Sequence, residues 1–160
     1  MPVTIMSQAK AFALAENYKH CDIVSIMDSR WEKELPPDAV ALDTYQSVLR
    51  LYFDDVEETA PGFGMRAPTR ADVQCAVDWG RGKDLDRLVV HCFQGISRSA
   101  ALAVVITCSH GVPPRDAFDM LISPRLHAPN RLILSLGRQI LGQDGIIDEY
   151  FARFSGRRQG

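Results

Sequence analysis

The part of this 160-residue chain that most constrains its fold is residues 85–109, where a short polar loop separates two apolar segments. The first segment, LDRLVV, is short and ends in β-branched residues, which is typical of a buried strand. The second runs from about Ser97 to Ser109, is long enough for a helix, and is stopped by Gly111. This pattern predicts a strand that ends in a tight loop and leads directly into a buried helix.

Segments typical of strands and of helices alternate along the rest of the chain. The predicted strands are Val3–Met6, Asp22–Met27 and Ser47–Phe53. Ser7 can cap a helix that runs to about Tyr18, and Thr69 can cap a helix from Arg70 to Trp79 that ends at Gly80. Further helices are predicted from Pro114 onward and from Leu132 to a stop at Gly142. An acidic loop rich in glycine and proline spans residues 54–69. The alternation favours an α/β fold with a central, mostly parallel sheet of four to five strands, flanked by helices on both faces. We expect one domain over residues 1–160, with a frayed tail at 153–160.

Composition and charge limit the possible partners. The net charge of -2 gives no general basic field, so we expect no binding to nucleic acid. The apolar runs are too short to cross a bilayer and the first residues lack a basic leader, so we expect a cytoplasmic protein without a membrane anchor. The oligomeric state is not predicted. The four cysteines are widely separated, so they suggest neither a zinc cluster nor a disulfide framework, and we expect no metal or cofactor: Cys21, Cys75, Cys92 and Cys108.

The loop HCFQGISRS has the chemistry of an oxyanion site. Cys92 and Arg98 are separated by five residues, a length that lets successive backbone N–H groups point inward around an anion. Gly95 permits the necessary turn, and the following helix presents its unsatisfied N–H groups to the same point. The planar fork of Arg98 can hold two phosphate oxygens at once. These features together favour a tetrahedral oxyanion, with Phe93, Gln94, Gly95, Ile96, Ser97 and Arg98 as the binding residues.

The thiol at the base of this loop is a candidate nucleophile. Amides and a guanidinium around Cys92 stabilise a thiolate, which is the nucleophilic form. Beneath a phosphate ester, the thiolate is placed for in-line attack on phosphorus. Ser99 can hydrogen-bond the sulfur and help it leave afterwards. We expect His91 to orient the loop through backbone contacts, and one of the other cysteines could form a protective disulfide with Cys92.

HCFQGISRS resembles the HCxxGxxRS signature of the cysteine-dependent protein tyrosine phosphatases, and its GISRS ending is most similar to the dual-specificity branch and its compact bacterial relatives. The resemblance extends over roughly residues 20–142. LRLYFDD is similar to the strand and loop that carry the family's general acid. PNRLILSLGRQIL is similar to the Pro-Asn-led helix near the end of these domains, which implies that Asn130 braces the catalytic loop. The resemblance implies hydrolysis of a phosphomonoester through a cysteinyl-phosphate intermediate.

The general acid lies among several neighbouring carboxylates. Asp55 best matches the family's aspartate, two residues after an apolar strand residue, and Asp54 is the rival. Glu57 and Glu58 follow in the same loop. The separation between Asp55 and Cys92 is 37 residues, a little longer than is usual in dual-specificity enzymes.

Three other functions compete with a protein tyrosine or dual-specificity phosphatase. The residues of the loop carry no lysine, which disfavours a phosphoinositide or another polyphosphorylated substrate without excluding it. A catalytically weak module that only binds a phosphorylated partner is a second alternative, against which the intact Cys92, Arg98 and Ser99 argue. A sulfur or arsenate enzyme is a third, but the arsenate reductase pattern places its cysteine near the N-terminus. The expected partner is therefore a phosphorylated protein or a small phosphomonoester.

Overall fold

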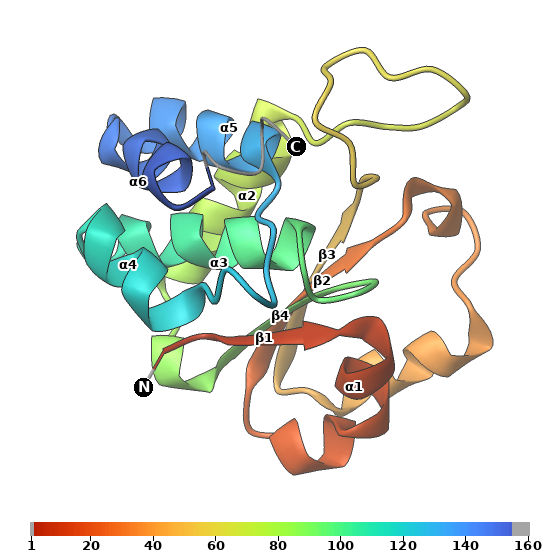
Figure 1. The fold of residues 1–160 in the computed structure, drawn as a ribbon. Helices are drawn as coiled ribbons and strands as arrows, with labels where there is room; N and C mark the ends of the chain where they lie inside the picture. Colours follow the sequence, from red (N-terminus) through yellow and green to blue (C-terminus); the bar gives the residue numbers. More distant parts are fainter. Residues whose placement is uncertain (1, 155–160) are drawn as a thin grey trace.

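A four-stranded parallel sheet forms the centre of the computed structural model, which describes residues 2–154 (Figure 1). The strands are β1 (Thr4–Ser7), β2 (Asp22–Met27), β3 (Ser47–Tyr52) and β4 (Leu88–Cys92). Their order in the sheet is β1-β4-β2-β3, and every neighbouring pair is parallel. The predicted mostly parallel sheet is confirmed, with four strands among the described residues.

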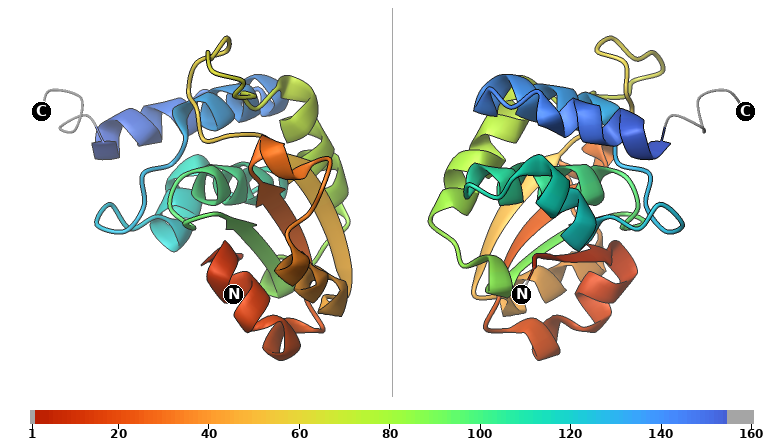
Figure 2. Two further views of the ribbon diagram at one scale, coloured as in Figure 1. Left: turned by 90° about the vertical axis from the view of Figure 1, so that its right-hand side faces the viewer. Right: turned by 60° about the vertical axis from the view of Figure 1, so that its left-hand side comes forward.

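Helices cover both faces of this sheet (Figures 1 and 2). The α-helices are α1 (Gln8–Ala13), α2 (Arg70–Arg81), α3 (Arg98–Ser109), α4 (Pro114–Leu121), α5 (Arg131–Leu141) and α6 (Gly145–Phe154). The 3-10 helices are η1 (Ala15–Tyr18), η2 (Ser29–Trp31), η3 (Pro37–Thr44) and η4 (Leu85–Arg87). Because successive strand residues face opposite sides, Val90 packs in the large core under α2–α6 while Val89 packs in the smaller core with α1 and η3.

The β4–loop–α3 unit lies in the middle of the molecule, as residues 85–109 predict. All five residues of β4 are buried, and so is α3 apart from its last residue. The strand is shorter at its start than predicted, because η4 occupies residues 85–87, and it ends two residues later, at Cys92. In a parallel sheet the carboxyl ends of the strands meet at one edge, so Cys92 lies at the same edge as the residues that follow β2 and β3.

The chain between β1 and β2, the end of α2 and the C-terminal segment differ from the prediction. Instead of one helix to Tyr18, α1 ends at Ala13 and tightens into η1, which is common at helix ends. Gly80 does not stop α2, because it lies inside the helix where it packs against Ile106. The sequence prediction lacks α6 and treats residues 153–160 as frayed.

The beginning of that tail is ordered as the last turn of α6. Phe154 is buried and stacks on Tyr150, and Arg153 forms ion pairs with Asp119 and Glu149, so the prediction is wrong for these two residues. The remainder, 155–160, lies outside the described residues. None of the helices that the structure describes has the length and apolarity needed to span a bilayer.

Candidate functional site

Cys92 is the last residue of β4, and its thiol lies at the base of the loop that follows. The side chain is almost fully buried. The backbone N–H of Gly95 donates to Sγ at 3.3 Å, and the hydroxyl oxygen of Ser99, in the first turn of α3, lies 3.1 Å from Sγ. A backbone N–H of the loop and a hydroxyl of α3 therefore both lie within hydrogen-bond distance of the sulfur.

Gly95 has a shape requirement of its own. Its φ of +73° lies in the left-handed region, and a Cβ at this position would come within 2.7 Å of backbone atoms of Met6 and Ser7. The loop is thus pressed against β1, and the N–H of Gln8 donates to the carbonyl of Phe93 at 3.1 Å. The glycine in the motif is needed both for the turn and for this close approach.

Arg98 is oriented by two oxygen acceptors at the carboxyl ends of β2 and β3. Its Nη1 donates to Asp28 Oδ1 and to the carbonyl of Phe53, both at 2.8 Å. These two bonds use both hydrogens of Nη1. Nε is buried and has no partner among the described residues, so the Nε–Nη2 edge of the guanidinium remains for a ligand. That edge has the geometry that binds two oxygens of one phosphate.

The two adjacent aspartates of the acidic loop have different environments. Asp54 is buried, and its carboxylate accepts hydrogen bonds from the N–H and hydroxyl of Ser29 and from the N–H of Arg66. Burial alone would raise the pKa of Asp54, but these bonds, together with the nearby Arg98 charge, lower it below its ordinary value. Asp54 is thus an ionised carboxylate that holds Arg66, near the end of the acidic loop, next to Ser29.

Asp55 has different partners from Asp54. Its Oδ1 accepts from the hydroxyl of Ser97 at 2.8 Å and from Nδ2 of Asn130 at 3.0 Å, and the residue is exposed. Of the two aspartates, it is the one that borders the same hollow as the thiol.

Asn130 joins three parts of the site. Its Nδ2 also donates to the carbonyl of Val56, its Oδ1 caps α5 by accepting from the N–H of Ile133, and its own N–H donates to the carbonyl of Ser97. Asn130 is fully buried. It therefore holds the acidic loop, the cysteine loop and the start of α5 in one arrangement.

His91 lies behind the loop, fully buried in β4. Its Nδ1 lies 3.3 Å from the carbonyl of Cys92, and its Nε2 lies 2.7 Å from the hydroxyl of Ser25. Burial lowers the pKa of His91 to about 4, aided by the Arg98 charge and opposed by the bond to the Cys92 carbonyl. The ring is neutral at pH 7, and because a carbonyl only accepts, Nδ1 carries the proton and Nε2 accepts from Ser25.

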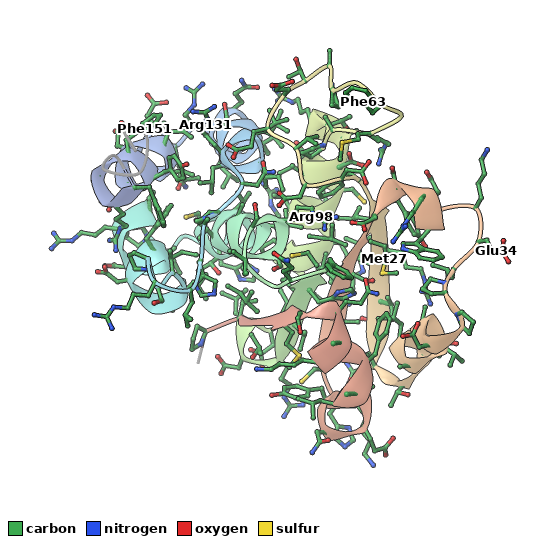
Figure 3. The ribbon with its side chains drawn as sticks, turned by 45° about the vertical axis from the view of Figure 1, so that its right-hand side comes forward. Met27, Glu34, Phe63, Arg98, Arg131 and Phe151 are labelled. Carbon is green, nitrogen blue, oxygen red and sulfur yellow. The ribbon has the colours of Figure 1, made fainter. Side chains whose placement is uncertain are left out.

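A hollow of about 250 Å³ opens above the thiol, lined by Asp55, Cys92, Phe93, Gln94, Ser97 and Arg98. Two of the residues predicted to bind the oxyanion do not line it with their side chains. Gly95 contributes the N–H that faces the sulfur, and Ile96 has a solvent-exposed side chain and a carbonyl that accepts from Ala128. Arg98 lies at the centre of the molecule in Figure 3.

Several solved structures share this architecture. The human tyrosine phosphatase-like serine/threonine/tyrosine-interacting protein shares 18% identity over 88% of each chain, with a TM-score of 0.58. DUSP15 shares 18% identity over 96% of this chain and 94% of its own, with a TM-score of 0.57. PTPMT1 in complex with PI(5)P shares 17% identity over 94% and 90%, with a TM-score of 0.53. The chain has the fold of the cysteine-dependent protein tyrosine phosphatases. No family model and no curated protein sequence matches it.

Within this phosphatase fold, two side chains of the site were missed from the sequence. Asp28 directly follows β2 and reaches Arg98, and Ser25 lies in β2 opposite His91. The rule that the carboxyl ends of parallel strands meet at one edge would have drawn attention to Asp28, because it stands at such an end. Nothing in the sequence pairs Ser25 with His91, since the contact depends on the strand order.

The structure separates Cys92 from the other cysteines. Cys21 precedes β2, whose first residue lies beside the first residue of β4, so the two thiols belong to opposite ends of the sheet, roughly 13 Å or more apart. Cys108 is buried near the end of α3, roughly 15 Å along the helix from Arg98. Cys75 is exposed on α2. A disulfide needs Cα atoms within about 7 Å, so neither Cys21 nor Cys108 can pair with Cys92 in this conformation.

Proposed function

We propose that this protein is a phosphomonoester hydrolase, a protein tyrosine or dual-specificity phosphatase that acts through a cysteinyl-phosphate intermediate. One observation carries the proposal: a buried thiol, a free guanidinium edge and a carboxyl group border the same small hollow. These are the nucleophile, the phosphate holder and the proton donor that such a reaction needs.

In the proposed first step, the Cys92 thiolate attacks phosphorus in line with the leaving oxygen. A sulfur–phosphorus bond forms, the phosphorus–oxygen bond breaks, and Asp55 gives its proton to the departing oxygen. In the second step, water attacks the cysteinyl phosphate and gives a proton to the Asp55 carboxylate. The sulfur leaves as a thiolate, stabilised by the Ser99 hydroxyl and the Gly95 N–H. Throughout, the free edge of Arg98 and the first N–H groups of α3 hold the phosphate oxygens.

The shape and charge of the hollow favour a singly phosphorylated substrate. Between Cys92 and Arg98 no residue carries a charge, so a second or third phosphate would find no cation in the loop. PTPMT1, solved in complex with PI(5)P, has a similar fold, and a phosphoinositide therefore belongs in any substrate panel. The exposed rim at Phe93 and Ile96 suits an aromatic or apolar neighbour of the phosphate.

The experiment compares Asp55→Asn with Asp54→Asn on two aryl phosphates, one with a poor and one with an activated leaving group. Asp55→Asn should slow turnover by roughly a hundredfold on the poor leaving group, and much less on the activated one, because an activated group departs without a proton. Asp54→Asn should reduce both rates by a similar, smaller factor, through the structure of the loop. Cys92→Ser should abolish turnover of both substrates.

Substantial turnover by the Cys92→Ser variant would disprove the proposed nucleophile. Leaving-group dependence in Asp54→Asn rather than in Asp55→Asn would reverse the roles of the two aspartates.

A further inference from the structure

A second and larger pocket, of about 560 Å³, lies between α5 and α6, outside the catalytic hollow. Figure 3 shows Arg131 on α5 and Phe151 on α6 side by side at this end of the molecule, well away from Arg98. A volume of this size is in the range of pockets that bind small molecules.

The apolar part of the pocket comes from both helices. Leu132 of α5 and Phe151 of α6 line it and belong to neither hydrophobic core, and Ile147 lies one turn before Phe151. Partly exposed apolar side chains that face one another across a pocket favour burial of an apolar ligand group between them.

The charges of the pocket are paired, with one exception. The N–H of Arg131 donates to Glu57 at 3.1 Å, and its guanidinium lies 3.5 Å from the same carboxylate. Arg138 donates to Asp144 at 3.1 Å. The carboxylate of Asp148 lines the same pocket and has no hydrogen-bond or ion-pair partner in residues 2–154. The lining therefore has a net charge of -1, which comes from Asp148. Asp148 lies on the turn of α6 that also carries Ile147 and Phe151.

We propose that the α5–α6 pocket is a ligand site for a small amphipathic cation, an ammonium or guanidinium group attached to an aromatic or aliphatic body. The cation pairs with Asp148, and the apolar body lies between Leu132 and Phe151. An anion of the same shape would meet an unpaired negative charge and two arginines that already have carboxylate partners.

The site adjoins the catalytic hollow without overlapping it. Asp55 lines the hollow, and Glu57, two residues later in the same loop, lines the α5–α6 pocket. The two sites share this short segment as a wall and have no lining residue in common. Their ligands should therefore bind simultaneously.

The test measures binding by calorimetry with the full-length protein, without vanadate and in excess vanadate, the oxyanion expected to occupy the catalytic hollow. The probes are 2-naphthylmethylammonium, 2-naphthoate and neutral 2-naphthalenemethanol. The ammonium probe should bind, and more tightly than the other two. Asp148→Asn should weaken binding of the ammonium probe about threefold or more, as expected for the loss of one partly exposed ion pair. Leu132→Ala should weaken binding of every probe that binds through its naphthyl group.

The matched control is Asp43→Asn, which removes one exposed carboxylate of η3 on the opposite face of the sheet and should leave binding unchanged. Equal binding of the three probes, loss of binding in excess vanadate, or equal effects of Asp148→Asn and Asp43→Asn would overturn the proposal. No turnover is measured, so the result is independent of the proposed phosphatase activity.

Discussion

The guanidinium of Arg98 carries five N–H hydrogens, and the protein uses two of them to fix its orientation. Asp28 and the Phe53 carbonyl take the two on Nη1, which fixes the plane of the guanidinium and leaves the Nε–Nη2 edge unused. The side chain of Arg98 is only 6% exposed, so its charge is held in a poorly solvated place. Asp28 therefore has two effects, since it neutralises part of that charge and orients the fork.

Replacing Asp28 by alanine tests whether this residue positions Arg98 or only contributes a negative charge at the surface. The fork would lose one acceptor, so the affinity for oxyanions and kcat should each fall about tenfold. Asp28→Asn keeps an oxygen that can accept from Nη1 and should recover most of the loss in kcat. Steady-state kinetics and tungstate inhibition measure both quantities, and Glu32→Ala, an exposed acid in the segment after η2, is the control. Equal kinetics for Asp28→Ala and wild type would rule out the role.

The buried imidazole of His91 makes a prediction about stability and pH. Its pKa is about 4 in the folded protein, against an ordinary value of 6.5. Below about pH 6.5 the histidine binds a proton in the unfolded state, whereas in the folded state it stays neutral down to about pH 4. The free energy of unfolding therefore falls as the pH is lowered from 6.5 to 4. The contribution is about 3 kcal/mol at most.

Urea unfolding at pH 7 and pH 4.5 tests this dependence. In His91→Gln the difference between the two pH values should be smaller than in wild type, while the exposed His20→Gln should leave it unchanged. The same pH dependence in His91→Gln as in wild type would contradict the prediction.

At the level of single residues, the sequence predicts the chemistry that is local and misses the chemistry that depends on strand order. Cys92, Gly95, Arg98 and Ser99 belong to one loop and helix start, so their proximity follows from their spacing. The contact of Arg98 with Asp28 crosses 70 residues and depends on β2 lying next to β4. For the same reason the sequence leaves Asp54 and Asp55 as rivals, whereas the contacts with Arg66 and Asn130 distinguish them.

Among the elements, α3 has the most demanding surroundings, because it packs between the sheet and its neighbouring helices. Gly137 of α5 faces Val105, and a Cβ there would overlap with a methyl group of that valine. Val105 is fully buried and β-branched, so it cannot rotate away. The glycine thus sets how closely α5 approaches α3, and through Asn130 at the start of α5 it also affects the site.

Gly137→Ala should destabilise the protein by about 1–3 kcal/mol, the usual cost of overpacking a core. Gly82→Ala is the matched control, because a Cβ at the end of α2 meets nothing within 4 Å and φ there is −86°. Chemical denaturation of both variants measures the difference. Equal stability of the two variants would show that α5 can move away from α3 at little cost.

The predicted elements succeed where hydrophobic periodicity and caps agree. The N-caps at Ser7 and Thr69 are confirmed, and β2 has the bounds predicted for it. The α6 helix is absent from the predicted elements, although its apolar residues recur at helical spacing, from Ile146 and Ile147 to Tyr150 and Phe154. The 3-10 helix η3 shows no strong amphipathic pattern and could not have been found by periodicity.

For the molecule as a whole, the site is a junction between segments that are distant in the sequence. The segment after β2 supplies Asp28, the segment after β3 supplies Asp55, β4 and α3 supply the thiol and the fork, and α5 begins at Asn130. If the hollow binds an oxyanion as proposed, the anion would contact several of these segments at once. It would therefore bind the folded chain only and stabilise the entire domain.

Tungstate at about one hundred times its dissociation constant should add about 2.7 kcal/mol of stability, which corresponds to an increase in Tm of roughly 5–10 °C for a domain of this size. Cys92→Ser should retain most of this increase, because the loop amides and the Arg98 fork are intact in that variant. In Arg98→Lys at the same tungstate concentration, the increase should fall to less than half, since a single ammonium cannot replace a fork that holds two oxygens.

Arg125→Lys, at an exposed position outside the hollow, is the control. Equal increases in Arg98→Lys and wild type would mean that the anion binds elsewhere, and loss of the increase in Cys92→Ser would mean that binding depends on the sulfur rather than on the loop.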